Sequence, residues 1–135
     1  MRHRLVIIAS MSLVLSACRN VDSDLPREYR AMAVPMDVLQ SPDAIRQGHD
    51  LFLRYCTLCH GVRGDGQGLQ REGLQPPPRD FTDPMWRAAT SPRQVFFAIR
   101  EGRRSTAMPS WKSLSEGDTW ELTAFILSLS GGSPH

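Results

Sequence analysis

Hydrophobic residues recur with the spacing of one helix face in three segments of the chain, which follow Ser41, Ser91 and Ser115. The residues with this spacing are Ile45, Gly48, His49 and Phe52, then Val95, Ala98 and Ile99, and then Leu122, Phe125, Ile126 and Leu129. Ser41-Pro42 and Ser91-Pro92 are typical helix starts, because serine caps the first turn and proline fits its first position. No segment has the alternating pattern of a strand. The sequence therefore predicts an all-α fold with three main helices.

The segments outside these helices divide the chain further. Residues 1–17 combine two arginines with the apolar run Leu5–Leu15, which is the layout of an export signal. This run is too short for a transmembrane helix, which needs about 20 residues. Residues 18–40 have no sustained apolar period, and Pro26 and Pro35 interrupt them, which predicts a flexible tether. The folded domain is expected over residues 41–130, followed by a flexible C-terminus at 131–135.

The end of the export signal, Leu15-Ser16-Ala17-Cys18, resembles the lipobox of bacterial lipoproteins. In that family, cleavage before the cysteine exposes it and lipid is attached to it. The resemblance implies that Cys18 is the lipidated mature N-terminus, which would anchor the protein on the periplasmic side of a bacterial membrane. The alternative is an ordinary signal peptide with an incidental cysteine.

Charge excludes a nucleic-acid partner. The chain has 16 basic and 14 acidic residues, and removal of Arg2 and Arg4 with the signal leaves a formally neutral protein. A nucleic-acid backbone needs a strong positive surface. Positive charge is concentrated only locally, at Arg100, Arg103, Arg104 and Lys112. This patch predicts docking to an acidic partner, with a solvated loop as the alternative.

The chemistry of the chain is indicated by Cys56-Thr57-Leu58-Cys59-His60, the C-x-x-C-H pattern of c-type haem attachment. Residues three apart lie on one side of a helical turn, so both sulfurs can reach one porphyrin and His60 can bind its iron. A redox dithiol would need a preceding strand, and a zinc site would need a fourth ligand. The glycine-rich run 61–68 lacks the Lys-Ser/Thr pair of a phosphate-binding loop. The pattern predicts one haem c, bound covalently through Cys56 and Cys59.

The sixth iron ligand is predicted to be Met108, because a thioether opposite histidine completes a low-spin iron. Met108 lies between the second and third helices and precedes Pro109, which stiffens the turn. The competitors are Met85, which can be a core residue, and His49, which shares the apolar face of the first helix.

With these motifs, residues 41–130 resemble a class I, monohaem cytochrome c. The resemblance implies three main helices and long loops around one haem, with close helix packing at Gly48. It also implies that the carbonyl of Pro77 or Pro78 accepts the second N–H of His60. Further haem contacts, to the propionates, are implied for Arg79, Trp86 and Trp111, although ordinary packing is an equal alternative for the tryptophans.

The predicted function is one-electron transfer rather than enzyme catalysis, because both axial positions of the iron are filled. The expected partners are redox proteins or a respiratory complex in the membrane. Lys112 is the single lysine of the chain, so the lysine-rich docking face of mitochondrial members is missing and their partner cannot be inferred. The alternative function is a haem enzyme or gas sensor with an open sixth site.

Overall fold

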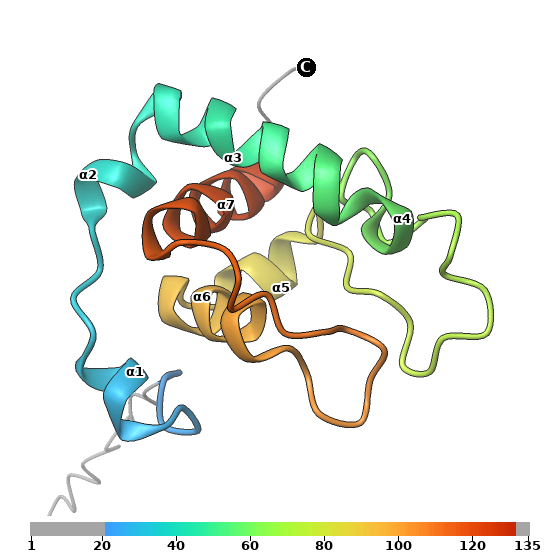
Figure 1. The fold of residues 1–135 in the computed structure, drawn as a ribbon, viewed down its shortest axis with the longest axis horizontal. Helices are drawn as coiled ribbons and strands as arrows, with labels where there is room; N and C mark the ends of the chain where they lie inside the picture. Colours follow the sequence, from blue (N-terminus) through green and yellow to red (C-terminus); the bar gives the residue numbers. More distant parts are fainter. Residues whose placement is uncertain (1–20, 132–135) are drawn as a thin grey trace, which may run out of the picture.

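The computed structural model describes residues 21–131, which are all-helical and contain no strand. Figure 1 shows the arrangement of the helices. In chain order they are α1 (Arg27–Ala31), α2 (Met36–Leu39), α3 (Pro42–Tyr55), α4 (Thr57–His60), α5 (Pro84–Ala88), α6 (Pro92–Glu101), α7 (Glu116–Ser128) and the 3₁₀-helix η1 (Leu129–Gly131). The predicted fold class is confirmed. The predicted export signal, Cys18 and the last four residues lie outside the described residues.

The three main helices begin where the serine caps predict. The Ser41 hydroxyl accepts a hydrogen bond from the backbone of the first turn of α3. Ser91 and Gln94 form a reciprocal capping box at the start of α6, and Ser115 and Asp118 form a second one at the start of α7. Local hydrogen bonding therefore fixes these ends, and sequence alone could identify them.

The longest helices, α3 and α7, cross in close contact at Gly48. A Cβ atom at Gly48 would lie 2.0 Å from the carbonyl oxygen of Glu121, so a larger residue cannot occupy this position without moving a helix. On the same interface, the rings of Phe52 and Phe125 pack with their centroids 5.1 Å apart. The close crossing implied by the family resemblance is present. On another side of α7, the Trp120 ring packs against Phe96 of α6.

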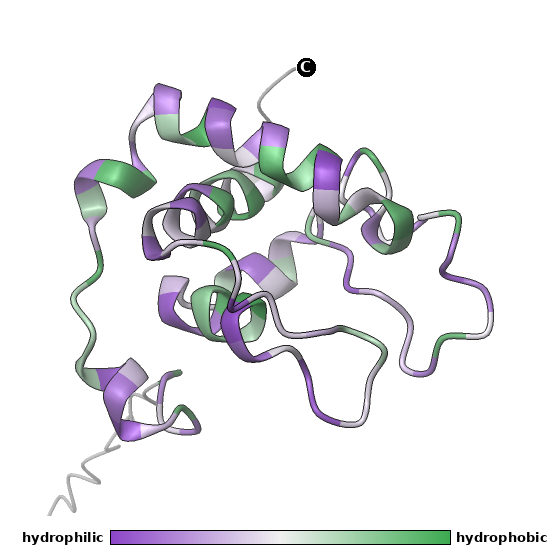
Figure 2. Cartoon of the chain, viewed as in Figure 1, coloured by the Kyte–Doolittle hydropathy of each residue, from purple (hydrophilic) through white to green (hydrophobic). Residues whose placement is uncertain are grey.

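The hydrophobic core lies between α3, α6 and α7 and includes one loop residue, Phe81. Its buried members are Phe52, Phe81, Val95, Ile99, Leu122, Phe125 and Ile126. Figure 2 shows both hydrophobic and hydrophilic residues along α3, as expected of a helix with one buried face. In α7, by contrast, Thr119 and Thr123 are also fully buried, because helices pack on several of its sides.

Residues 21–40, here called the N-terminal strap, lie against the domain. The tether prediction is therefore wrong for these residues. Pro26 and Pro35 are the N-caps of α1 and α2, and the ring of Tyr29 packs edge-on against Phe97 with 4.8 Å between centroids. Leu25 is buried as well. Helices of five and four residues are too short to show a helical period in sequence, which is why the pattern did not reveal them.

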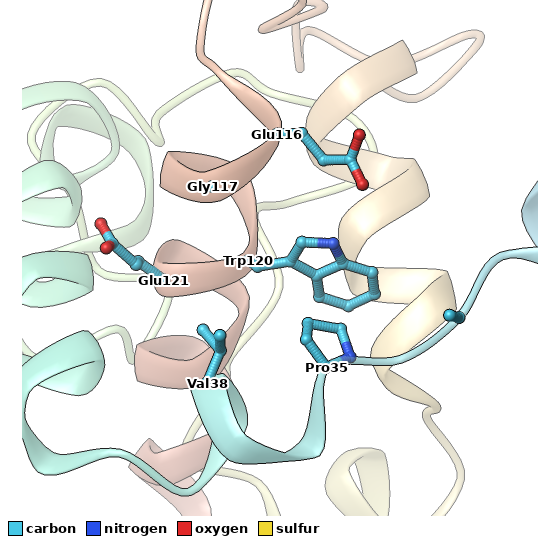
Figure 3. A pocket seen from close by; sticks show the side chains of 7 residues that line it. Pro35, Val38, Glu116, Gly117, Trp120 and Glu121 are labelled. Carbon is cyan, nitrogen blue, oxygen red and sulfur yellow. The ribbon is translucent and has the colours of Figure 1, made fainter.

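The strap and α7 line an open, mostly apolar pocket of about 450 Å³ (Figure 3). Its lining residues are Ala33, Pro35, Val38, Glu116, Gly117, Trp120 and Glu121. None of the candidate site residues lines it, so this pocket is separate from the C-x-x-C-H motif. Among residues 21–131, no helix has the length and hydropathy needed to cross a membrane.

Candidate functional site

The C-x-x-C-H motif forms one helical turn at the end of α3. Cys56 is the C-cap of α3, and Cys59 and His60 belong to α4. The backbone N–H groups of Cys59 and His60 both donate to the Cys56 carbonyl oxygen, at 3.3 and 2.9 Å. This turn places the two half-buried thiols on neighbouring positions, and neither is in a disulfide. Figure 1 shows α4 at the end of the molecule opposite the strap.

The environment of Cys56 differs from that of an activated redox thiol. The Cys56 side chain packs against the hydrophobic core. Burial, and secondarily the neighbouring Cys59, raises the pKa of the Cys56 thiol to about 12. Reactive dithiols have a depressed pKa, and the thioredoxin-like arrangement has a strand before the motif, where this chain has α3. The dithiol alternative therefore has no support in the structure.

A structural zinc site also lacks its ligand set in the described part of the chain. Between residues 21 and 131, no group of three or more His, Cys, Asp or Glu side chains is placed to hold a metal ion. A structural zinc site takes four such ligands. Cys56, Cys59 and His60 are thus close in sequence without forming a closed tetrahedral cluster.

The imidazole of His60 is held in one orientation and one protonation state. Its Nδ1 lies 3.1 Å from the carbonyl oxygen of Arg79, and because a carbonyl only accepts hydrogen bonds, Nδ1 carries the proton. Burial lowers the pKa of His60 below its ordinary value, with the Arg79 hydrogen bond opposing this effect. The ring of Phe81 stacks on the imidazole, 4.5 Å between centroids. Neutral His60 therefore has its Nε2 lone pair available to bind a metal.

The carbonyl partner of His60 corrects the expectation that Pro77 or Pro78 provides it. The acceptor is Arg79, one residue after the proline run. The Pro78 carbonyl instead lies against Gly66, where a Cβ atom would approach it to 2.8 Å. Gly66 has φ +75°, a left-handed conformation that glycine adopts readily. Successive carbonyls in an extended segment point in different directions, so the sequence could not distinguish these neighbouring residues.

The three candidates for the sixth ligand differ in burial and packing. Met85 is 76% exposed on the short helix α5, whereas Met108 is half-buried. The Met108 backbone is fixed on both sides, because its N–H donates to Thr106 Oγ1 and its carbonyl accepts from the Arg103 N–H, both at 3.2 Å. His49 packs on the Phe125 ring at the α3–α7 crossing. Burial and a fixed backbone thus distinguish Met108 from the exposed Met85, and the assignment of Met108 as the sixth ligand stays a prediction.

The remaining predicted haem contacts occupy positions around the motif. Trp86 and Trp111 are half-buried against the hydrophobic core, where Trp86 contacts Phe81 and Trp111 contacts Tyr55. The Arg79 side chain is exposed, and only its backbone carbonyl is engaged with His60. A propionate role for these three side chains stays a prediction. Phe81 was not singled out as a site residue, and its spacing from the motif carries no signal for the stacking on His60.

The predicted positive patch is smaller than the sequence suggests. The Lys112 ammonium pairs with Glu101 at 2.6 Å. The Arg100 guanidinium donates to the carbonyl oxygen of Leu114 at 2.6 Å. Within residues 21–131, the exposed side chains of Arg103 and Arg104 form no ion pair. Two of the four positive charges therefore contribute to local structure, and two face solvent.

Comparison with known families agrees with this geometry. Residues 43–126 match the family described as cytochrome C oxidase, cbb3-type, subunit III. The chain belongs to this cytochrome c family. A curated relative of this cytochrome, cytochrome c55X of Stutzerimonas stutzeri, is 34% identical over 85 residues, which are 59% of this chain and 64% of the relative. The chain thus spans less than two thirds of the length of that relative.

Solved structures show the same fold. One similar chain belongs to the Kuenenia stuttgartiensis reducing HAO-like protein complex, with a TM-score of 0.58 and 29% identity over 66% of this cytochrome and 44% of that chain. Cytochrome cL from Methylophaga aminisulfidivorans has a TM-score of 0.50 and 21% identity, and the match covers 65% of this cytochrome and 56% of that chain. The second likeness supports the fold alone.

The residues of this cytochrome fit a covalently bound haem c. Cys56 and Cys59 are free thiols on one helical turn, and His60 is a neutral imidazole with Nδ1 already hydrogen-bonded. The two thiols would form the thioether links, and His60 Nε2 would bind the iron. When bound, haem c supplies an iron that exchanges single electrons between its ferrous and ferric states. The chain holds the ligand ring through the Arg79 carbonyl and covers one face of it with the Phe81 ring.

Proposed function

We propose that this cytochrome carries single electrons on the periplasmic side of a bacterial membrane, anchored by lipid on Cys18, either freely or as a subunit of a respiratory complex. The electron-transfer part of this proposal rests on His60, a neutral imidazole that lies beside two free thiols and donates a hydrogen bond from Nδ1 to the Arg79 carbonyl. With His60 and Met108 both as ligands, an iron held here would have no open position, which favours electron transfer over binding of a substrate or gas.

Binding of carbon monoxide to the reduced holoprotein distinguishes the carrier from a haem enzyme or gas sensor. We expect no change in the haem spectrum of the parent protein at carbon monoxide concentrations that saturate the Met108→Ala variant, because Met108 would occupy the sixth position and leave the parent with a much lower apparent affinity. Rapid formation of a carbon monoxide complex by the parent would overturn the proposal and favour an open iron site. The Met108→Ala variant serves as the positive control, since its iron has an open position.

The membrane anchor is supported by the lipobox-like sequence that ends at Cys18. Only two residues separate Cys18 from the start of the N-terminal strap at Val21, a reach of about 10 Å when extended. In cell fractionation, Cys18→Ser should release haem protein into the soluble fraction or block its processing, while the parent stays with the membrane. A mature N-terminus at any residue other than Cys18 would contradict the anchor.

A role as a complex subunit is supported by two comparisons: the family description names an oxidase subunit, and one structural relative is part of a redox complex. Purification of the cytochrome from native membranes in mild detergent tests this role. Stoichiometric co-purification of an oxidoreductase supports a permanent subunit, and recovery of the cytochrome alone supports a free carrier.

A further inference from the structure

The N-terminal strap contacts both the start and the end of α6. At the start of α6, the Ser91 hydroxyl donates to Asp22, and the Arg93 guanidinium pairs with Asp22 at 3.2 Å. At the end of α6, the Tyr29 hydroxyl donates to Glu101 Oε1 at 2.5 Å. Residues 22–32 of the strap therefore lie against α6, the helix that leads into residues 102–114, here called the Met108 loop.

Glu101 connects the strap to that loop. Its Oε1 accepts the hydrogen bond from Tyr29, and its Oε2 pairs with the Lys112 ammonium at 2.6 Å. The Lys112 hydrogen bond and then the Tyr29 hydrogen bond lower the pKa of Glu101, so this carboxylate is charged at neutral pH. Tyr29 is 72 residues away in sequence, and Lys112 lies on the returning side of the loop. One carboxylate thus joins the strap, the last residue of α6 and the Met108 loop.

The base of the Met108 loop is also bonded directly to the end of α6. The Ser110 hydroxyl donates to the Arg100 carbonyl at 2.6 Å, and the Trp111 N–H donates to the Ile99 carbonyl at 3.0 Å. At Gly102, a Cβ atom would lie 2.7 Å from the Met108 carbonyl oxygen. Because the loop is packed this closely, a shift of its base relative to α6 has to move the Met108 backbone.

We propose that the N-terminal strap positions the Met108 loop through Tyr29, Glu101 and Lys112, and that these contacts hold Met108 in the place from which it binds iron. Tyr29, Glu101 and Lys112 are positioning residues in this account. The inference rests on the proposed function, in which Met108 is the sixth ligand. In this account, residues far from the haem motif determine the fraction of molecules in which Met108 is not bound to the iron.

The test measures carbon monoxide binding by the reduced holoprotein, because the apparent affinity rises with the fraction of molecules in which Met108 has left the iron. Tyr29→Phe removes one hydroxyl, keeps the ring and changes no charge. We expect it to raise the apparent affinity several-fold, up to about tenfold, the range that one ordinary intramolecular hydrogen bond supplies. An affinity equal to that of the parent would overturn the inference.

Asp22→Asn is the matched control, because it weakens the strap at the other end of α6. If the strap only stabilises the fold, Asp22→Asn and Tyr29→Phe should have the same effect, a lower melting temperature with unchanged carbon monoxide binding. That result contradicts a positioning role. We expect instead that only Tyr29→Phe changes carbon monoxide binding.

The half-exposed Lys112 side chain provides a second test, which keeps the inference falsifiable if Tyr29→Phe does not fold. Lys112→Gln should raise carbon monoxide binding, and Lys112→Arg, which retains the pair with Glu101, should restore the parent value. Equal behaviour of the two variants would contradict the role of the ion pair.

If Met108→Ala itself leaves carbon monoxide binding unchanged, the assignment of the sixth ligand is wrong. If Met108→Ala opens the site and the strap variants do not, only this inference fails.

Discussion

His60 shows how backbone and burial together prepare one side chain for a metal. The Arg79 carbonyl fixes the proton on Nδ1, and burial keeps the ring neutral. The stacked Phe81 ring restricts rotation of the imidazole. These three contacts leave Nε2 as the available ligand atom, so the ligand is oriented before it binds iron.

Replacement of Met108 and Met85 tests the assignment of the sixth ligand. Met108→Ala should lower the reduction potential, because the thioether that favours ferrous iron is lost. Met85→Ala should leave the potential unchanged, since the Met85 side chain is 76% exposed on α5. Potentiometric titration of the two holoproteins measures the effect. The opposite pattern would assign the ligand to Met85.

Tyr29 gives a prediction in the alkaline range. Burial, and then the hydrogen bond to Glu101, raises the pKa of Tyr29 to about 12 from its ordinary value of 10.0. The folded state thus holds the phenol proton more tightly than the unfolded state. This stabilisation is complete below pH 10 and is lost as the pH rises to about 12. The melting temperatures of the parent and Tyr29→Phe should therefore converge over this interval. A constant difference would contradict the shift.

Sequence could identify the ligating residues but not the groups that orient them. Cys56, Cys59 and His60 were predictable because their spacing alone brings them onto one turn. The Arg79 carbonyl was not, because its direction depends on how Pro78 packs against Gly66. The sequence specifies which side chains are present, whereas the direction of a backbone carbonyl in a loop depends on tertiary packing.

Among the helices, α3 and α7 form the contact on which the fold depends. Gly48 allows their backbones to meet, and the Phe52 and Phe125 rings fill the space beside it. The motif begins at Cys56, directly after α3. Helix packing at Gly48 therefore also determines where the haem attachment turn lies relative to α7.

Alanine at two glycines tests this contact. Gly48→Ala should lower the free energy of unfolding by about 3 kcal/mol or more, since the new Cβ would overlap the Glu121 carbonyl and the helices must separate. The control is Gly117→Ala in α7, where the nearest atom to a Cβ is Ser115 Oγ at 3.7 Å. It should be neutral or stabilising by up to about 1 kcal/mol. Urea unfolding of the holoproteins measures both, and equal stabilities would contradict the close crossing.

The starts of the three main helices were easier to predict from sequence than the short helices α1 and α2. Ser41, Ser91 and Ser115 cap their helices through local hydrogen bonds, which sequence encodes directly. The strap helices α1 and α2 are stabilised by distant partners such as Glu101, so their own residues do not reveal them. Short segments held by tertiary contacts therefore have no recognisable pattern in their own sequence.

In the molecule as a whole, the charge of the predicted patch that faces solvent is that of Arg103 and Arg104, whose exposed side chains form no ion pair within residues 21–131. Lys112 and Arg100 are engaged with Glu101 and Leu114. Figure 1 shows the Met108 loop projecting away from the strap, toward the side of α4. The two exposed arginines thus lie on the loop that carries the proposed ligand, where charge can orient a redox partner.

Charge reversal tests this docking role. Changing Arg103 and Arg104 to glutamate should slow electron transfer to the partner protein at low salt, with the effect disappearing as ionic strength rises. The matched control reverses Arg27 and Arg30, which are exposed on α1 and give the same change in net charge. Stopped-flow rates with the co-purified redox partner measure both. Rates insensitive to salt and to Arg103 and Arg104 would favour a subunit docked through apolar contacts.

The central claim is that this chain carries one haem through Cys56 and Cys59, and the mass of the denatured mature protein tests it most directly. We predict a mass that exceeds the processed polypeptide with its lipid by one haem, because thioether links survive unfolding. Alanine at either cysteine should weaken or abolish this attachment. A protein that loses its haem on denaturation, or a colourless protein that binds zinc, would contradict the account.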